Sequence, residues 1–224
     1  MSEFYDLLLA SKLSGGGGGG GSFDFCDPAF PSGAIESDRS MEIWSGMFLN
    51  RVGITKISMP NATMFNSDSF KGATALEEVH LPLAKMKAYA GSPFEGCTSL
   101  KKIVLPSETN GLYSRFAKGC TSLEAFDSIT PSLGNSDGFN GCTKLKLLVL
   151  RKSSICTLGN INWFTGTPYA NGGTGGEAYV PSALLSSYPT ASNWSTINGY
   201  GTITWKAIEG SYYETHYADG TPIS

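Results

Sequence analysis

The sequence predicts a β-rich solenoid of about five coils with a cap at each end, preceded by a short helix on a poly-glycine tether. The first observation is a phrase that opens with Phe, continues with Gly and ends in Thr-x-Leu. It occurs four times, at residues 70–76, 94–100, 116–123 and 139–145. The second observation is the spacing of its closing leucines, which are 24, 23 and 22 residues apart (Leu76, Leu100, Leu123 and Leu145). A period of about 20–29 residues is typical of solenoids, whose units bury their apolar faces by stacking.

The composition agrees with one lightly charged, folded body. Of the 224 residues, 41% are hydrophobic and only 16% are charged. The net charge of −3 is too small to predict attraction to nucleic acid or to an anionic membrane. No segment reaches the ~20 apolar residues that a membrane-spanning helix needs. We therefore expect no nucleic-acid partner and no membrane span.

Residues 1–14 are predicted to form a short anchoring helix. Its apolar side chains share one broad face, and a helix this short is marginal unless it packs on something else. The segment has no positively charged start and too short an apolar run for a secretion signal. We therefore expect the chain to stay in the cytoplasm unless it leaves in a larger particle. The expected assembly anchor consists of Phe4, Tyr5, Leu7, Leu8, Leu9 and Leu13.

Residues 15–22 form a linker of seven consecutive glycines followed by Ser22. Such a tract behaves as a flexible coil, so it is either part of a floppy end or a tether between the anchor and a displayed body. We favour the tether, because a disordered end would not normally carry the four leucines and two aromatic residues found in residues 1–13.

Residues 23–50 and 151–224 are predicted to cap the two ends, because the terminal repeats of a solenoid are atypical. The first segment is irregular and rich in aromatic residues (Phe23, Phe25, Phe30, Trp44 and Phe48). The second is expected to contain a strand ending in proline at 177–181, a short helix at 182–188 and a final strand at 203–208. A partly exposed tail rich in tyrosine follows it.

Residues 51–150 are predicted to be the repeats themselves. After each closing leucine a strand begins, and its alternation points Val79 and Leu81 into the core. A degenerate first strand is expected at residues 54–60, one period before the strand that follows Leu76. The Phe that opens each phrase should fill the core from the opposite side of the coil.

The outward positions of these strands carry charges whose sign alternates from coil to coil. Stacked coils would therefore place acid beside base, which fixes the register although each exposed pair contributes only about 0–1 kcal/mol. We favour this structural interpretation, and the alternative is a ligand-binding face. The candidate residues of that face are Glu77, Glu78, His80, Lys101, Lys102, Glu124 and Lys146, and the other outward residues are Val104, Ala125, Asp127, Leu147 and Val149.

The cysteines predict buried thiols rather than cross-links or a metal site. The chain has five, an odd number that argues against a fully paired disulfide framework (Cys26, Cys97, Cys120, Cys142 and Cys156). Three of them hold the same place beside the glycine of successive phrases, where a small apolar side chain fits. No Cys-x-x-Cys occurs and the two histidines are far apart in sequence, so no metal or cofactor is expected.

The full phrase Phe-x-Gly-Cys-x-x-Leu-x-x-Ile-x-Leu-Pro, complete at residues 94–106, resembles the BspA-like leucine-rich repeats. The resemblance covers about residues 50–150, and residues 178–195 resemble the unit that commonly closes such arrays. Three repeats depart from the phrase. Ala73 replaces the Cys of the first, Leu148 and Arg151 replace the Ile and Pro of the last, and residues 116–127 gain one residue and lose Leu-Pro. The coil with the insertion should therefore be distorted.

The resemblance implies an interaction module rather than an enzyme. Members of that family are surface proteins of bacteria, or come from protists and phages, and the bacterial ones usually carry a secretion signal and an anchor. A short N-terminal helix on a glycine tether looks more like a phage or prophage virion protein, which assembles in the bacterial cytoplasm and displays a distal domain.

The first hypothesis is therefore a non-enzymatic structural and recognition protein of a virion, as a tail fibre, tail part or capsid decoration. Residues 1–14 would bind other virion proteins, the repeats would bind a host surface glycan or protein, and the chain would form a homo-oligomer, with a trimer as the expected state. The alternative is a bacterial cell-surface adhesin module. A third hypothesis is a glycan hydrolase that uses the outward carboxylates, but these alternate with lysines and form no evident pair of acids.

Motifs of catalysis are not convincing here. Gly134-Asn-Ser136-Asp-Gly138 spells a nucleophile motif, but it lies in a predicted turn rather than between a core strand and a helix. The glycine tract follows a helix, so a dinucleotide site is not expected. No catalytic residue is assigned.

Overall fold

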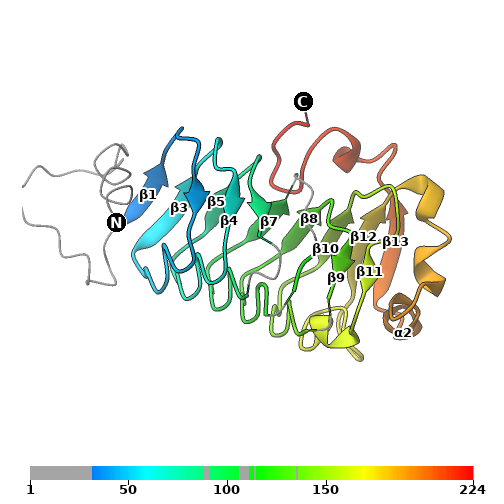
Figure 1. Cartoon of the computed structure of the whole chain (residues 1–224). Helices are drawn as coiled ribbons and strands as arrows, with labels where there is room; N and C mark the ends of the chain where they lie inside the picture. Colours follow the sequence, from blue (N-terminus) through cyan, green and yellow to red (C-terminus); the bar gives the residue numbers. More distant parts are fainter. Residues whose placement is uncertain (1–31, 88–90, 106–110, 114, 135, 224) are drawn as a thin grey trace, which may run out of the picture.

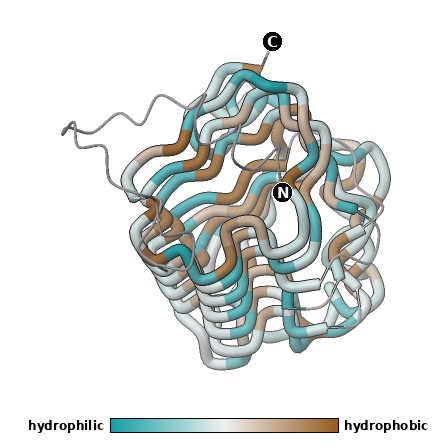
Figure 2. Tube along the Cα trace, turned by 60° about the vertical axis from the view of Figure 1, so that its left-hand side comes forward, coloured by the Kyte–Doolittle hydropathy of each residue, from teal (hydrophilic) through white to brown (hydrophobic). Residues whose placement is uncertain are grey.

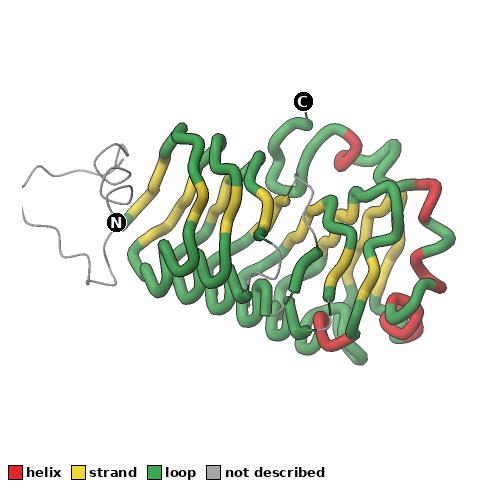
Figure 3. The backbone as a smooth tube through the Cα atoms, viewed as in Figure 1, coloured by secondary structure: helices red, strands yellow, loops and turns green. Residues whose placement is uncertain are grey.

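The computed structural model describes residues 32–87, 91–105, 111–113, 115–134 and 136–223, and it shows a solenoid of stacked coils (Figure 1). The fold class predicted from the spacing of the phrases is confirmed. Short strands recur from coil to coil, and helices gather mainly at the C-terminal end (Figure 3). The predicted anchor at 1–14, the linker at 15–22 and Cys26 lie outside the described residues.

The main sheet receives one strand from each successive coil, and all its neighbours pair in parallel. It forms two hydrogen-bonded groups, β1-β3-β5 and β7-β8-β10-β12-β13, whose facing strands β5 and β7 lie side by side. Its strands are β1 (Gly33–Glu36), β3 (Ile54–Ser58), β5 (Glu78–His80), β7 (Lys102–Leu105), β8 (Ala125–Ser128), β10 (Leu147–Leu150), β12 (Gly176–Val180) and β13 (Ile203–Ala207). Both predicted cap segments therefore contribute strands that continue the sheet of the repeats.

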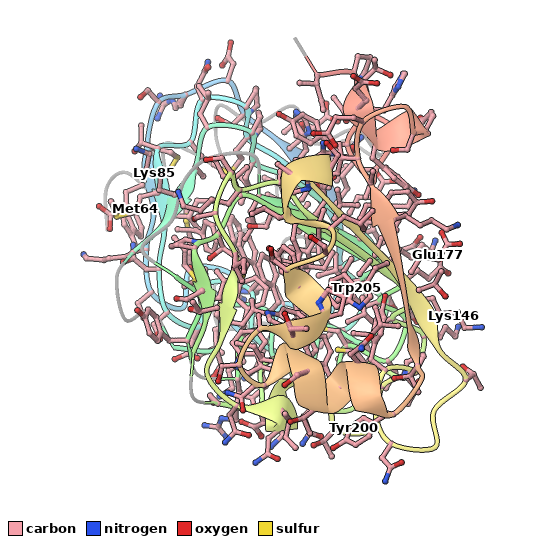
Figure 4. The ribbon with its side chains drawn as sticks, turned by 90° about the vertical axis from the view of Figure 1, so that its right-hand side faces the viewer. Met64, Lys85, Lys146, Glu177, Tyr200 and Trp205 are labelled. Carbon is pink, nitrogen blue, oxygen red and sulfur yellow. The ribbon has the colours of Figure 1, made fainter. Side chains whose placement is uncertain are left out.

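A second set of two-residue strands lies on the other side of each coil. Met64 and Lys85 mark that side in Figure 4, opposite Glu177 of the main sheet and Lys146, which directly precedes β10. These strands pair in parallel as β2-β4-β6 and β9-β11, and Leu112 adds an isolated parallel bridge to Leu133. They are β2 (Glu42–Ile43), β4 (Met64–Phe65), β6 (Lys85–Met86), β9 (Ser132–Leu133) and β11 (Thr157–Leu158).

The core between the two sheets is one continuous apolar cluster that extends from Ile35 to Ile197. Hydrophobic segments of successive coils lie behind one another along the solenoid (Figure 2). The opening phenylalanines form a ladder within this core. The rings of Phe48, Phe70 and Phe94 are stacked at 5.5 and 5.2 Å with interplanar angles of 9° and 4°.

The inserted residue at 116–123 turns this ladder, as expected from the longer phrase. Phe94 N–H donates to the carbonyl of Phe116, while Ala117 N–H donates to that of Gly138. Ala117 therefore occupies the backbone position of an opening Phe, and the Phe116 ring meets Phe94 at 76° instead of stacking. The distortion stays local, because β7 and β8 pair without a register shift.

The cysteine column is buried, which confirms the prediction for the described thiols. Cys97, Cys120 and Cys142 have no exposed surface. Each Sγ donates to a carbonyl of the preceding coil, at 3.0 Å for Cys97 and Cys120 and 3.1 Å for Cys142. Burial raises the pKa of the Cys120 thiol well above its usual value, so this thiol is not a nucleophile at neutral pH.

The C-terminal end is closed by aromatic residues and short helices. Trp194 Nε1–H donates to the carbonyl of Cys156 at 2.7 Å, and the N–H of Cys156 donates to the Tyr188 hydroxyl at 2.9 Å. Trp205 of β13, labelled in Figure 4, packs against both rings, with centroids at 5.2 Å from Tyr188 and 5.7 Å from Trp194. The helix predicted at 182–188 is instead two 3₁₀ segments. The helical elements are η1 (Ile161–Phe164), η2 (Ser182–Leu184), η3 (Tyr188–Thr190), α2 (Trp194–Gly199) and η4 (Tyr212–Glu214).

Candidate functional site

The outward face of the main sheet is charged over β1 to β7. The parallel register places Lys56 beside Glu78, and the Lys56 ammonium lies 3.7 Å from that carboxylate and 3.9 Å from Glu36. Glu77 lies 2.5 Å from Lys101 in the next coil. The hydrogen bond from Lys101 to Glu77 raises the pKa of this lysine. The predicted pairing of acid with base between coils is thus confirmed for these pairs.

Over β8 and β10 the same face is covered, which corrects the prediction that the strand residues there point to solvent. The C-terminal tail that covers them is itself partly exposed, as predicted. Ala125, Asp127 and Val149 point outward but are buried. They lie beneath residues 208–223, here called the strap, whose Ile208 and Ala218 form a small second apolar cluster with Ala125 and Val149. In Figure 1 the strap crosses above β7 and β8.

An ion pair beneath the strap holds it in place. Arg151 donates from Nε and Nη2 to the two oxygens of Asp127 at 2.6 and 2.7 Å, with side chains only 10% and 1% exposed. The guanidinium also donates to the carbonyls of Tyr213 and His216, at 2.6 and 2.8 Å. Ala218 N–H donates to Asp127 at 2.8 Å. The charges of the pair are thus desolvated yet fully hydrogen-bonded, the condition under which a buried pair is tolerated.

Burial raises the pKa of the Asp127 carboxyl, although the bonds from Arg151 and Ala218 act in the opposite direction. The Arg151 guanidinium also lies 5.0 Å from the centre of the Tyr217 ring, a cation–π distance. Arg151 occupies the position at which other repeats have proline. This departure from the phrase was the one sequence signal of the ion pair beneath the strap.

Between the strap and the uncovered strands lies a groove of about 440 Å³, here called the strap groove. Five of the seven predicted face residues line it (Glu77, Glu78, His80, Lys101 and Lys102). Glu124 and Lys146 are exposed but lie outside it. Sequence reasoning missed its other wall, which consists of Asp219 and Thr221 of the strap.

The strap groove combines charge with an apolar floor. Val79 and Val104 form that floor, and an adjoining hollow adds Pro82 and Tyr217. While the ammonium groups of the other two lysines of the groove are paired with glutamates, the Lys102 ammonium has no ion pair or hydrogen bond to any other described residue. The groove therefore offers one available cation beside apolar surface, which suits an acidic group next to an aliphatic or aromatic one.

The turn that spells a nucleophile motif does not contain catalytic geometry. The Ser136 hydroxyl donates to Asp137 Oδ1 at 3.1 Å, and Asp137 is paired with Lys118 at 2.6 Å. A serine nucleophile needs a base to accept its proton, and this carboxylate is a weaker base than usual, because the bond from Lys118 lowers its pKa. Among the described residues, no group of three or more metal-ligating side chains is found, and no helix is long and apolar enough to cross a bilayer.

A family profile described as "BspA type Leucine rich repeat region" matches residues 41–167 in six copies. The chain belongs to the BspA-type leucine-rich repeat family. The match extends beyond the predicted repeats at both ends, in agreement with the strands found in the two cap segments. The strap groove thus opens on the repeats of a BspA-type array, with a wall supplied by residues that follow the array.

Among solved structures, the chain is similar to a leucine-rich repeat protein of T. pallidum, TpLRR. It is 18% identical, with a TM-score of 0.37, over 57% of this chain and 78% of that one. No curated protein matches the chain.

Proposed function

We propose that this BspA-type protein is a non-enzymatic recognition protein that binds a protein partner through the strap groove. The observation that carries the proposal is the strap itself, which the buried Asp127–Arg151 pair fixes across the sheet. Because both walls are held before binding, little conformational freedom remains to be lost when a partner docks. The available Lys102 and the apolar floor favour a partner segment with an acidic side chain beside an apolar one.

Capture of the partner tests this proposal. A photo-crosslinking side chain at position 221, in the groove, is expected to capture a surface protein of the recognised cell. The same side chain at position 85, on the opposite side of the molecule, is expected not to capture it (Figure 4). Lys102→Glu should then weaken binding of the captured protein at least about tenfold, while Lys85→Glu leaves it unchanged. Equal capture at both positions would place recognition elsewhere.

We further propose that the protein is displayed on a virion, as a tail or capsid appendage. The support is the apolar pattern of residues 1–14 and the glycine linker behind it, which suit an anchor and a tether. Other virion proteins would bind the anchor, and a homo-oligomer, with a trimer as the expected state, would present several grooves and raise the overall affinity for the host surface. A bacterial cell-surface adhesin is the second candidate, since membership of the BspA-type family favours it equally.

Mass spectrometry of density-purified virus particles from the source culture distinguishes the virion protein from the bacterial adhesin. A fixed copy number relative to the major capsid protein is expected for a virion component, whereas recovery from cell envelopes alone would make the protein an adhesin. Deleting residues 1–14 should abolish incorporation and leave the solenoid folded. Full incorporation of the shortened chain would refute the anchor.

A further inference from the structure

A second concave surface lies at the C-terminal end, at the edge of the molecule opposite the strap. It is built around η1 and α2, which lie side by side at the bottom of Figure 1. Two hollows of about 450 and 330 Å³ share Asn162 and Thr165, so they form one continuous surface, here called the amide groove. This size is typical of small-ligand sites.

The amide groove is neutral where the same edge of earlier coils is charged. The position before the repeated glycine holds Lys71, Glu95 and Lys118 in successive coils, and Lys71 lies 2.9 Å from Glu95. The next two coils have Asn140 and Thr165 there, and both line the groove. The one charged residue among the described lining, Asp137, is already paired with Lys118. The groove therefore offers no free cation to a phosphate or a carboxylate.

Its polar groups are available to a ligand. The side-chain amides of Asn140, Asn162 and Asn171 and the hydroxyl of Thr165 make no hydrogen bond to other described residues. An amide both donates and accepts hydrogen bonds. It therefore matches neighbouring hydroxyl groups of a sugar, which also do both.

An aromatic side chain completes the groove. Tyr200 lines it beside Ile161 and Ile197, packs against the core, and lies at the lower edge of the molecule (Figure 4). The face of an aromatic ring carries partial negative charge. It attracts the weakly positive C–H groups that cover one face of a pyranose ring. The amides can bond to the hydroxyl groups at the edge of the sugar ring, and the aromatic ring can pack on its C–H face. A sugar site needs both kinds of contact.

The backbone that carries these side chains is fixed before binding. Asn160 caps η1 by accepting a bond from Asn162 N–H at 2.8 Å. Thr165 N–H donates to the carbonyl of Asn162 at 3.2 Å, and the carbonyl of Thr165 accepts from Gly141 at 2.9 Å. A preformed site loses less conformational entropy on binding, so a few hydrogen bonds suffice for measurable affinity.

We propose that the amide groove binds a neutral oligosaccharide. The proposal is independent of the strap groove and of its protein partner, because the two surfaces share no residue. Isothermal titration of the full chain with cellohexaose, maltohexaose and chitohexaose tests it, with a hyaluronan hexasaccharide as the acidic comparator. At least one neutral probe is expected to bind with a Kd of about 10⁻⁴ to 10⁻³ M.

Matched variants locate the binding. Asn162→Ala and Tyr200→Leu should each weaken it at least about tenfold, equivalent to about 1.4 kcal/mol. Lys102→Ala in the strap groove should leave it unchanged. Because the exposed Asn162 side chain has no partner to lose, that variant keeps the test valid even if Tyr200→Leu fails to fold. The proposal is overturned if no neutral probe binds at about 10 mM, if Asn162→Ala binds like the wild type, or if the groove prefers the acidic probe or an extended peptide.

Discussion

At the scale of single residues, Arg151 and Asp127 contribute the contacts that distinguish this chain from a regular array of repeats. Their bidentate pair is nearly buried, and it links two strands to three backbone groups of the strap. Removing one partner leaves the other charge without compensation in an apolar environment. This situation is far more costly than the absence of both charges.

Arg151→Ala is therefore expected to lower the free energy of unfolding by about 3–5 kcal/mol. The double variant Arg151→Met, Asp127→Leu should recover most of this loss, because it removes both charges and keeps apolar volume. Urea denaturation followed by circular dichroism measures both changes. A single variant within experimental error of the wild type would show that the pair is solvated.

Glu177 gives a pH dependence of known sign. Its bonds from Lys206 and the Tyr179 hydroxyl lower its pKa below the ordinary 4.5. A carboxyl whose pKa is lowered by folding stabilises the protein above its unfolded pKa, and this contribution disappears as the pH falls through the folded value. Because the carboxylate is half exposed, the effect is small.

Glu177→Gln should thus reduce stability slightly at pH 7 and leave it unchanged once the wild-type carboxyl is protonated. Urea midpoints of the two proteins, measured at pH 7 and at an acid pH where the wild-type carboxyl is protonated, check the sign of this pH dependence. A difference that grows toward acid pH would mean that folding raises the pKa instead. Addition of salt should shrink the difference at pH 7, since the pair is solvent-exposed.

At the scale of elements, the strap is a separate layer added to a completed coil. The main core cluster, with the residues packed against it, extends no further than Trp205, while the strap contacts the small outer cluster that contains Ala125 and Val149. Its loss therefore exposes part of one sheet face and leaves the interior packing intact.

Deletion of residues 210–224 should accordingly leave the coils folded and expose the outward side of β8 and β10. Faster hydrogen exchange in these strands and increased binding of a hydrophobic dye are the expected results. Exchange in β1 and β2, which contribute no residue to the strap groove, serves as the internal control. Uniform loss of protection along the whole chain would show that the strap is needed for folding.

The elements also show what sequence reasoning could reach. The main-sheet strands of the repeats were predictable, because apolar residues alternate after each closing leucine, whereas β1 lies in a segment that was expected to be irregular. The strands of the second sheet have only two residues each, too few to carry an alternating pattern. Half of the strap groove was predictable from outward charges. The strap wall was not, because its contacts with Asp127 and Arg151 join positions 62 to 91 residues apart, and no repeat spacing encodes them.

At the scale of the whole molecule, each coil is stabilised mainly by its two neighbours, as in other solenoids. The inserted residue at 116–123 shows that this arrangement tolerates a repeat of irregular length. It rotates the Phe116 ring out of the aromatic stack, yet the repeated glycines of this coil and the one before it keep their backbone hydrogen bonds to the next coil. Gly96 and Gly119 donate to Lys118 and Asn140 at the same 2.8 Å.

Leu123, in that coil, has no exposed surface. Leu123→Ala should cost about 2–5 kcal/mol and shift unfolding of the whole array in one transition, because the core is continuous across it. Thermal unfolding combined with hydrogen exchange at both ends measures this. Two separate transitions would show that the array is two units joined at the middle coil.

The buried pair beneath the strap also makes the strap a reporter on the assembly of the array. Asp127 and Arg151 come from neighbouring coils, and Arg151 N–H donates to the carbonyl of Ser128 at 2.9 Å, so the guanidinium reaches the carboxylate only when β8 and β10 are in register. The strap is synthesised after both coils. A chain whose coils slip by one residue during synthesis would present no docking surface for the strap, which would then remain open to proteases.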